Sequence, residues 1–108
     1  MSRLTMEKKM YKFKKHKRQY LENHKYVFKT IYVLDFGHIK YSISPTIEPS
    51  FDKMVSGWIV TYENRISKQC ETIDESFERN FQDCKEWLIE KLNYWNKIMN
   101  KVAQSWAA

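Results

Sequence analysis

Basic and aromatic side chains alternate near the start of the sequence, in residues 8–18. Seven of these eleven residues are Lys or Arg, and none is acidic. Because lysines neutralise phosphates and aromatic rings stack on bases, this composition predicts contact with nucleic acid or a nucleoprotein complex. Lysine outnumbers arginine, which favours contacts with the phosphate backbone over readout of base edges. The predicted binding residues are Lys8, Lys9, Tyr11, Lys12, Phe13, Lys14, Lys15, Lys17 and Arg18.

Two other interpretations of this segment remain open. The same pattern is typical of a solvated helix face in a lysine-rich protein, and of a surface that binds an acidic protein. Binding to a membrane surface is the weakest alternative, because few large apolar residues accompany the bases. We therefore expect no membrane partner.

The remaining reactive side chains do not form a recognisable catalytic or metal-binding motif. His16, His24 and His38 lack metal-ligand spacing, and Cys70 and Cys84 are expected to be free thiols. With two glycines in the chain there is no glycine-rich phosphate loop, and the expected strands contain no acid-x-Lys triplet of a nuclease. We expect a protein that is not an enzyme, with no metal, no cofactor and no small-molecule substrate.

Large aromatic and apolar residues recur along the end of the chain at helical spacing. They predict either burial against the protein's own sheet or an interface for a protein target or a second copy of the chain. A helix of thirty residues would be about 45 Å long, longer than the roughly 35 Å diameter of a compact domain of this size. The predicted partner-interface residues are Trp87, Lys91, Tyr94, Trp95, Ile98, Met99 and Trp106.

The elements that position these residues follow from hydrophobic periodicity. The spacing predicts a helix over residues 5–24, within a basic N-terminal segment of residues 1–25. Residues rich in β-branched and aromatic side chains predict strands over 26–36, 39–47 and 54–63, with a weaker strand over 66–72. Two prolines, Pro45 and Pro49, are expected to end the second of these strands or to place it at a sheet edge.

The last helix is expected to begin at a capping box in residues 72–75 and to span residues 73–104. The predicted fold is therefore α+β: a single domain of residues 1–108 with a basic N-terminal helix, an antiparallel three- to four-stranded meander over 26–72, and a long amphipathic C-terminal helix packed on one sheet face. The core is expected to bring Trp58 together with Phe77, Phe81, Leu88 and Leu92.

This order of elements resembles that of a double-stranded RNA-binding domain. The first turn of the expected last helix is acidic, however, with Asp74, Glu75 and Glu78, and would repel a nucleic-acid backbone. The resemblance therefore assigns no function.

Charge is unevenly distributed along the chain. The net charge is +6, yet residues 1–29 hold ten bases and two acids, so the remaining chain is slightly acidic. No signal peptide or membrane span is recognisable, which predicts a cytoplasmic protein. We expect a small non-catalytic binding protein of the kind that phages and mobile elements carry as accessory proteins. The alternative is a protein-directed inhibitor of a host nuclease or defence complex, anti-CRISPR-like or anti-restriction-like, acting through the C-terminal helix.

Overall fold

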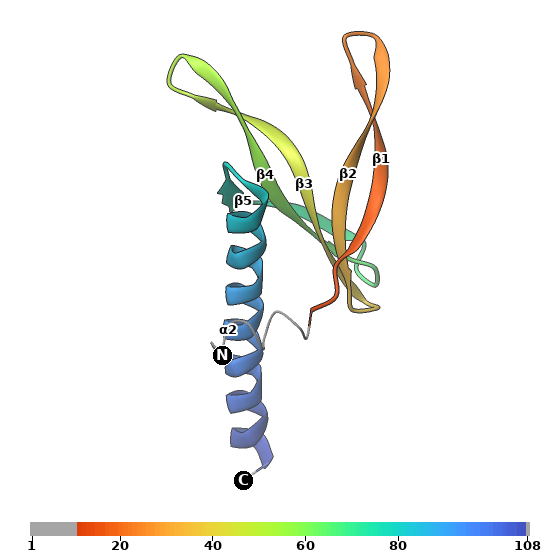
Figure 1. The fold of residues 1–108 in the computed structure, drawn as a ribbon. Helices are drawn as coiled ribbons and strands as arrows, with labels where there is room; N and C mark the ends of the chain where they lie inside the picture. Colours follow the sequence, from red (N-terminus) through yellow and green to blue (C-terminus); the bar gives the residue numbers. More distant parts are fainter. Residues whose placement is uncertain (1–10, 108) are drawn as a thin grey trace.

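The computed structural model describes residues 11–107, with side chains up to residue 99 and at residue 101. The fold is α+β, as predicted, with one antiparallel sheet and one helix packed on it (Figure 1). The sheet has five strands and not the predicted three to four, because part of the expected N-terminal helix is a strand. Each strand pairs with its neighbours along the chain. The elements are β1 (Lys14–Glu22), β2 (Lys25–Asp35), β3 (Ile39–Ser50), β4 (Lys53–Asn64), β5 (Gln69–Glu78) and the helix α2 (Phe81–Ala107).

The predicted N-terminal helix is wrong where the structure describes it, because residues 14–22 form strand β1. This strand pairs with β2 in an unbroken antiparallel register from Lys14 opposite Val33 to Glu22 opposite Lys25. The turn between them is Asn23-His24, and both residues have positive φ, as a two-residue hairpin of type I′ requires. Pairing with β2 therefore outweighs the thin helical stripe of this segment. Residues 1–10 of the expected helix lie outside the described residues.

The sheet divides into two arms above a short shared base (Figure 1). β2 pairs with β3 only where residues 32–35 face residues 40–43. Above this base, β1 and β2 form the first arm, residues 14–31, and β3 and β4 form the second arm, residues 44–59. Pro45 and Pro49 lie in the second arm, where β3 has a neighbour on one side only. Proline cannot donate to a neighbouring strand, so the edge position predicted for both is confirmed.

The main core lies between the sheet and α2. Leu34, Tyr41, Ile43 and Val60 from the sheet are buried against Cys84, Leu88 and Leu92 from the helix. Trp58 and Phe81 pack against this cluster, with ring centroids 5.3 Å apart. These four predicted core residues, Trp58, Phe81, Leu88 and Leu92, are thus brought together.

Phe77 does not join this cluster, and its predicted place in the core is wrong. It belongs to β5 rather than to the helix, and its ring covers Gly57 of β4. A Cβ atom at position 57 would lie 2.5 Å from that ring and from the backbone oxygen of Glu78, so the close approach requires glycine.

The helix begins later than the sequence predicts, because residues 72–75 belong to β5, where Thr72 and Ile73 pair with Thr61 and Val60 of β4. β5 is irregular between its pairs with Val60 and Trp58, and the buried Ser76 hydroxyl accepts a hydrogen bond from the Val60 amide there (2.8 Å). The observed helix cap is Asn80, whose Oδ1 accepts from the Asp83 amide at 2.8 Å. The Asp83 carboxylate in turn accepts from the Asn80 side-chain amide at 2.8 Å.

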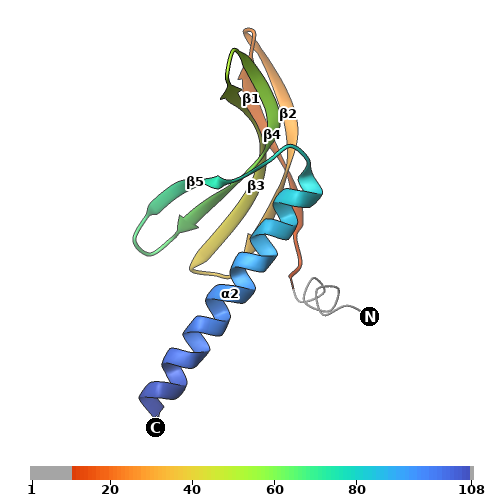
Figure 2. The same cartoon turned by 90° about the vertical axis from the view of Figure 1, so that its left-hand side faces the viewer.

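α2 packs against β3, β4 and β5 and then continues past the sheet (Figure 2). Its 27 residues correspond to about 40 Å, and the molecule measures 59 × 34 × 27 Å. The predicted overhang of the helix is therefore confirmed. No helix in the part of the chain that the structure describes is both long and apolar enough to cross a membrane.

Candidate nucleic-acid interface

Strand β1 distributes the basic segment over both faces of the first arm. Successive side chains of a strand point to opposite faces, so Lys15 and Lys17 share the face of Tyr32, whereas Lys14, His16 and Arg18 share the face of Val33. All five basic side chains are exposed to solvent. The bases therefore form two rows that flank one strand.

β1 is the outermost strand of the sheet, since it pairs with β2 on one side and with no other described strand. Its outer edge presents backbone N–H and C=O groups between the two rows of basic side chains. A polyanion lying along this edge can thus be reached from both faces of the strand.

The basic rows carry little compensating negative charge. Lys17 Nζ donates to the Thr30 hydroxyl at 2.7 Å, and Lys15 Nζ lies 5.9 Å from the centre of the Tyr32 ring. Among the described residues, no acid forms an ion pair with a base of residues 14–18. The one acid of β1, Glu22, pairs with Lys29 near the tip of the arm.

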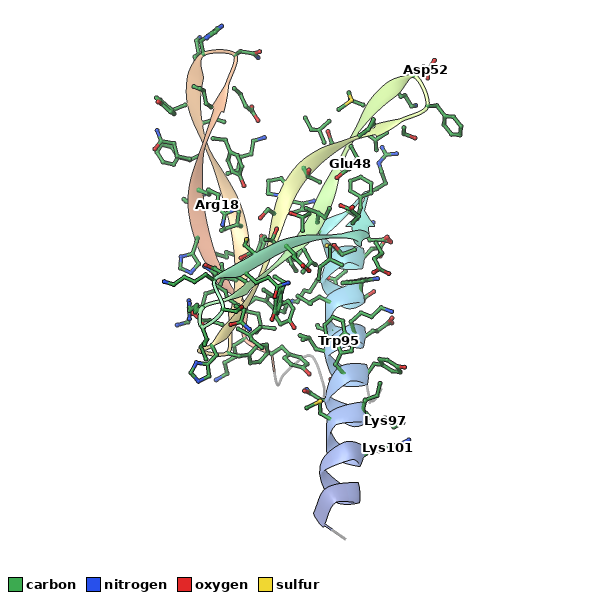
Figure 3. All side chains as sticks on the ribbon, turned by 180° about the vertical axis from the view of Figure 1, so that it is seen from behind. Arg18, Glu48, Asp52, Trp95, Lys97 and Lys101 are labelled. Atoms are coloured by element: carbon green, nitrogen blue, oxygen red, sulfur yellow. The ribbon has the colours of Figure 1, made fainter. Side chains whose placement is uncertain are left out.

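A shallow hollow of about 220 Å³ opens on the face of β1 that carries His16 and Arg18. Figure 3 labels Arg18 on the first arm. The other charged residues of the hollow are already in ion pairs. Arg65 binds Asp35 through both terminal nitrogens at 2.7 and 2.8 Å, and Lys40 pairs at 2.9 Å with Glu63, which lies outside the lining. Arg18 is therefore the cation of β1 that is available to a ligand at this hollow. The remaining lining residues are Ile31 and Val33.

The two aromatic residues predicted to stack on bases are placed against the helix instead. The Tyr11 hydroxyl donates to Asn93 Oδ1 at 2.8 Å, and the Phe13 ring lies 5.3 Å from Lys85 Nζ. Both side chains are half-buried against the core. Lys12 is exposed beside them, and Lys8 and Lys9 lie outside the described residues.

Two aromatic residues in the strand predicted over 26–36, which are not among the predicted binding residues, are exposed. Tyr26 and Phe28 of β2 have 68% and 67% of their surface accessible. Little in the sequence indicates this exposure, because a strand with apolar residues on both faces is expected to be covered on both faces. The one indication of this exposure in the sequence is that Lys25 and Lys29 occur in the same strand as the two aromatic residues.

The predicted partner interface on α2 is divided between core and surface. Trp87 packs against the core with Lys91 Nζ 5.7 Å from its ring, and Trp95 stacks on Tyr41 at 6.3 Å between ring centres. Tyr94, Ile98 and Met99 are exposed. Trp95 also lines a hollow of about 210 Å³ beside Phe36 and Ile39. Figure 3 shows Trp95 at the level where the helix leaves the sheet. The side chain of Trp106 lies outside the described residues.

The cysteines are free and lie apart from the basic strand. Cys84 is buried in the core, and burial raises the pKa of its thiol to about 12, so the thiol stays protonated and donates to the Ser76 carbonyl. Cys70 is exposed on β5. The described residues bring together no group of three or more His, Cys, Asp or Glu side chains that could hold a metal ion. Comparison with family models, with curated proteins and with solved structures finds no match to this chain.

Proposed function

We propose that this protein binds nucleic acid along the outer edge of β1, through the phosphate backbone and without reading base sequence. The observation that carries the proposal is the concentration of Lys14, Lys15, Lys17 and Arg18 on one exposed edge strand, where none of them forms an ion pair with a described acid. Phosphate neutralisation of this kind supplies most of the affinity in sequence-independent binding.

The geometry of a strand suits a repeating anion. Side chains two residues apart on one face are about 6.6–6.8 Å apart, which is the spacing of Lys15 and Lys17. On the other face Lys14 and Arg18 lie about twice as far apart, with His16 between them. The outward-facing backbone N–H groups of β1 lie between the rows and can donate to phosphate oxygens.

Lysines on an edge strand also have a structural explanation, because charge there prevents edge-to-edge aggregation. The two explanations make different predictions for a neutral edge. Loss of the charges removes nucleic-acid binding if the bases contact phosphates. If the bases only prevent edge-to-edge aggregation, loss of the charges increases self-association, and there is no nucleic-acid binding to remove.

The test replaces Lys14, Lys15, Lys17 and Arg18 together by Gln. A matched control replaces four exposed lysines elsewhere, Lys53, Lys68, Lys97 and Lys101, and changes the net charge equally. Fluorescence anisotropy is measured with labelled 20-nucleotide single strands and 20-base-pair duplexes over a range of salt concentrations.

Wild type should show a log–log salt slope of about −0.9 per phosphate contact for the duplex and about −0.7 for the single strand. The β1 variant should lose most of the affinity and of the slope, and the control should keep both. Salt-independent binding, no binding by wild type, or equal loss in both variants would contradict the proposal.

A second candidate function is binding to a protein through the far half of α2, either as an inhibitor of a nuclease or defence complex or as a homodimer. It is favoured by the exposure of Tyr94, Ile98 and Met99 beyond the end of the sheet, since soluble proteins seldom leave several large apolar side chains together in water. Its test is given in the Discussion.

A further inference from the structure

The first arm exposes a pair of aromatic rings on the face that α2 leaves open. Tyr26 and Phe28 share the face of Tyr32 and Leu34, which point toward the helix side of the sheet. The helix packs against β3, β4 and β5, so it covers the base of this face but not the arm (Figures 1 and 2). Two large rings are thus presented to solvent on a fully paired hairpin.

On the same face, β1 is basic toward the base of the arm and polar, then apolar, opposite the two rings. On the same face of β1, Lys17 lies opposite Thr30, Gln19 opposite Phe28 and Leu21 opposite Tyr26. Within residues 14–33, the charged side chains of this face are Lys15 and Lys17, and it carries no acid. Cations and exposed rings therefore lie in adjacent strands of one surface.

The spacing of the two rings along β2 corresponds to two steps of a stacked nucleic-acid strand. Tyr26 and Phe28 are two residues apart on one strand, which separates their backbones by about 6.6–6.8 Å. Two steps along a stacked nucleic-acid strand cover nearly the same distance, at about 3.4 Å each. A base can stack against an exposed ring only if its face is free, which is true of unpaired bases and not of those inside a duplex.

We infer that the first arm binds single-stranded nucleic acid, with unpaired bases stacked on Tyr26 and Phe28 and the backbone held by Lys15 and Lys17. This inference rests on the proposed function, and it adds the class of nucleic acid and the residues that select it. Stacking is tolerant of sequence because every base has an aromatic face, so the selectivity is for the single-stranded form and not for a base order.

The same patch could instead receive a protein, because Leu21 beside Tyr26 is also exposed. The basic surroundings and the absence of acid on this face of the arm favour a polyanion, and we make protein docking an outcome of the test.

The experiment compares Tyr26→Ala/Phe28→Ala with Phe51→Ala/Met54→Ala, which removes exposed apolar side chains from the tip of the second arm. The probes are a labelled 20-nucleotide oligo-dT and a 20-base-pair duplex. A conservative exchange, Tyr26→Phe/Phe28→Tyr, keeps both rings and serves as the rescue variant. Thermal unfolding is measured for each variant, and all should unfold near the wild-type temperature because these side chains are exposed.

Removal of the two rings should weaken oligo-dT binding about tenfold or more, while the duplex affinity and the salt slope stay within about twofold of wild type. The control and the ring-exchange variant should bind oligo-dT as wild type does. Unchanged oligo-dT affinity in the ring-deletion variant would overturn this inference and leave the role of the β1 bases intact. A change in its sedimentation with unchanged oligo-dT affinity would assign the patch to protein docking and also overturn it. If the variant without the β1 bases binds both probes normally, the proposed function itself is wrong.

Discussion

At the scale of single residues, a hydrogen-bonded ion pair joins two turns at the base of the sheet. The Asp35 carboxylate accepts from both terminal nitrogens of Arg65 and from the Gly37 amide at 2.7–2.8 Å. Arg65 also donates to the Gly37 carbonyl at 2.7 Å, and its backbone amide donates to the His38 carbonyl at 2.8 Å. The hydrogen bonds from Arg65, then that from Gly37, lower the pKa of Asp35 from 3.8 to about 2.

This pair predicts a defined pH dependence of stability. Because the pKa of Asp35 is lower in the folded chain, the ion pair stabilises the fold above the ordinary carboxyl pKa of 3.8, and that contribution is lost as the pH falls through about 2. Asp35→Asn should therefore lower the unfolding temperature at neutral pH, and the difference from wild type should shrink between pH 4 and pH 2. Thermal unfolding across this range measures it, with the exposed Asp52→Asn as control. A constant difference down to pH 2 would show that the loss is not electrostatic.

At the scale of elements, the sequence predicts strands more reliably than it predicts their ends and partners. Strands β2, β3 and β4 were predicted to within a few residues, because alternation and β-branched residues mark them directly. β1 was mistaken for a helix because basic side chains point to both of its faces. It therefore lacks the alternation of apolar and polar residues that marks a half-buried strand. The Asn23-His24 turn contains no glycine, so the hairpin that defines β1 was also inconspicuous.

The candidate site was predictable in part for the same reason. Charge is visible in a sequence, so Lys14, Lys15, Lys17 and Arg18 could be named without a structure. Whether an aromatic residue is covered depends on the neighbouring elements. Tyr11, which was predicted to stack on bases, therefore packs against the core. Tyr26, which was not named as a binding residue, is exposed.

The position of the helix cap gives a test at this scale. Asn80→Ala should cost about 1 kcal/mol, because the Asp83 amide loses the side-chain oxygen that accepts its hydrogen bond. Thr72→Ala removes the hydroxyl of the cap that the sequence predicts, and it should cost less, since Thr72 is exposed in β5. Urea denaturation followed by circular dichroism at 222 nm compares the two. A larger loss for Thr72→Ala would place the start of the helix where the sequence predicts it.

At the scale of the whole molecule, the two edge strands of the sheet carry opposite charge. β1 holds four Lys or Arg residues and one acid, whereas β5 at the other edge holds four acids and no base. The electrostatic potential therefore changes from positive at β1 to negative at β5. This difference steers a polyanion toward the first arm and away from β5. This direction agrees with the proposed binding edge.

The overhanging half of α2 provides the test of the second candidate function. If two copies pair through this half, wild type should sediment as a dimer at tens of micromolar, and Met99→Glu should sediment as a monomer because a charge would be buried in the interface. Met99 is 65% exposed, so this substitution spares the fold, whereas Trp95 is also stacked on Tyr41. If wild type remains a monomer at the highest concentration, a homodimer is excluded. If Met99→Glu binds every protein target of wild type with undiminished affinity, inhibition through this half of α2 is excluded.

The strictly sequential order of the five strands also has a kinetic consequence. Every pairing in the sheet joins strands that follow one another along the chain, so few contacts require distant segments to meet before a hairpin closes. Chains with such low contact order fold fast for their β content. The β3–β4 hairpin has twelve paired positions and is the longest register, so it is the natural nucleus. We expect docking of α2 to follow and to complete the core.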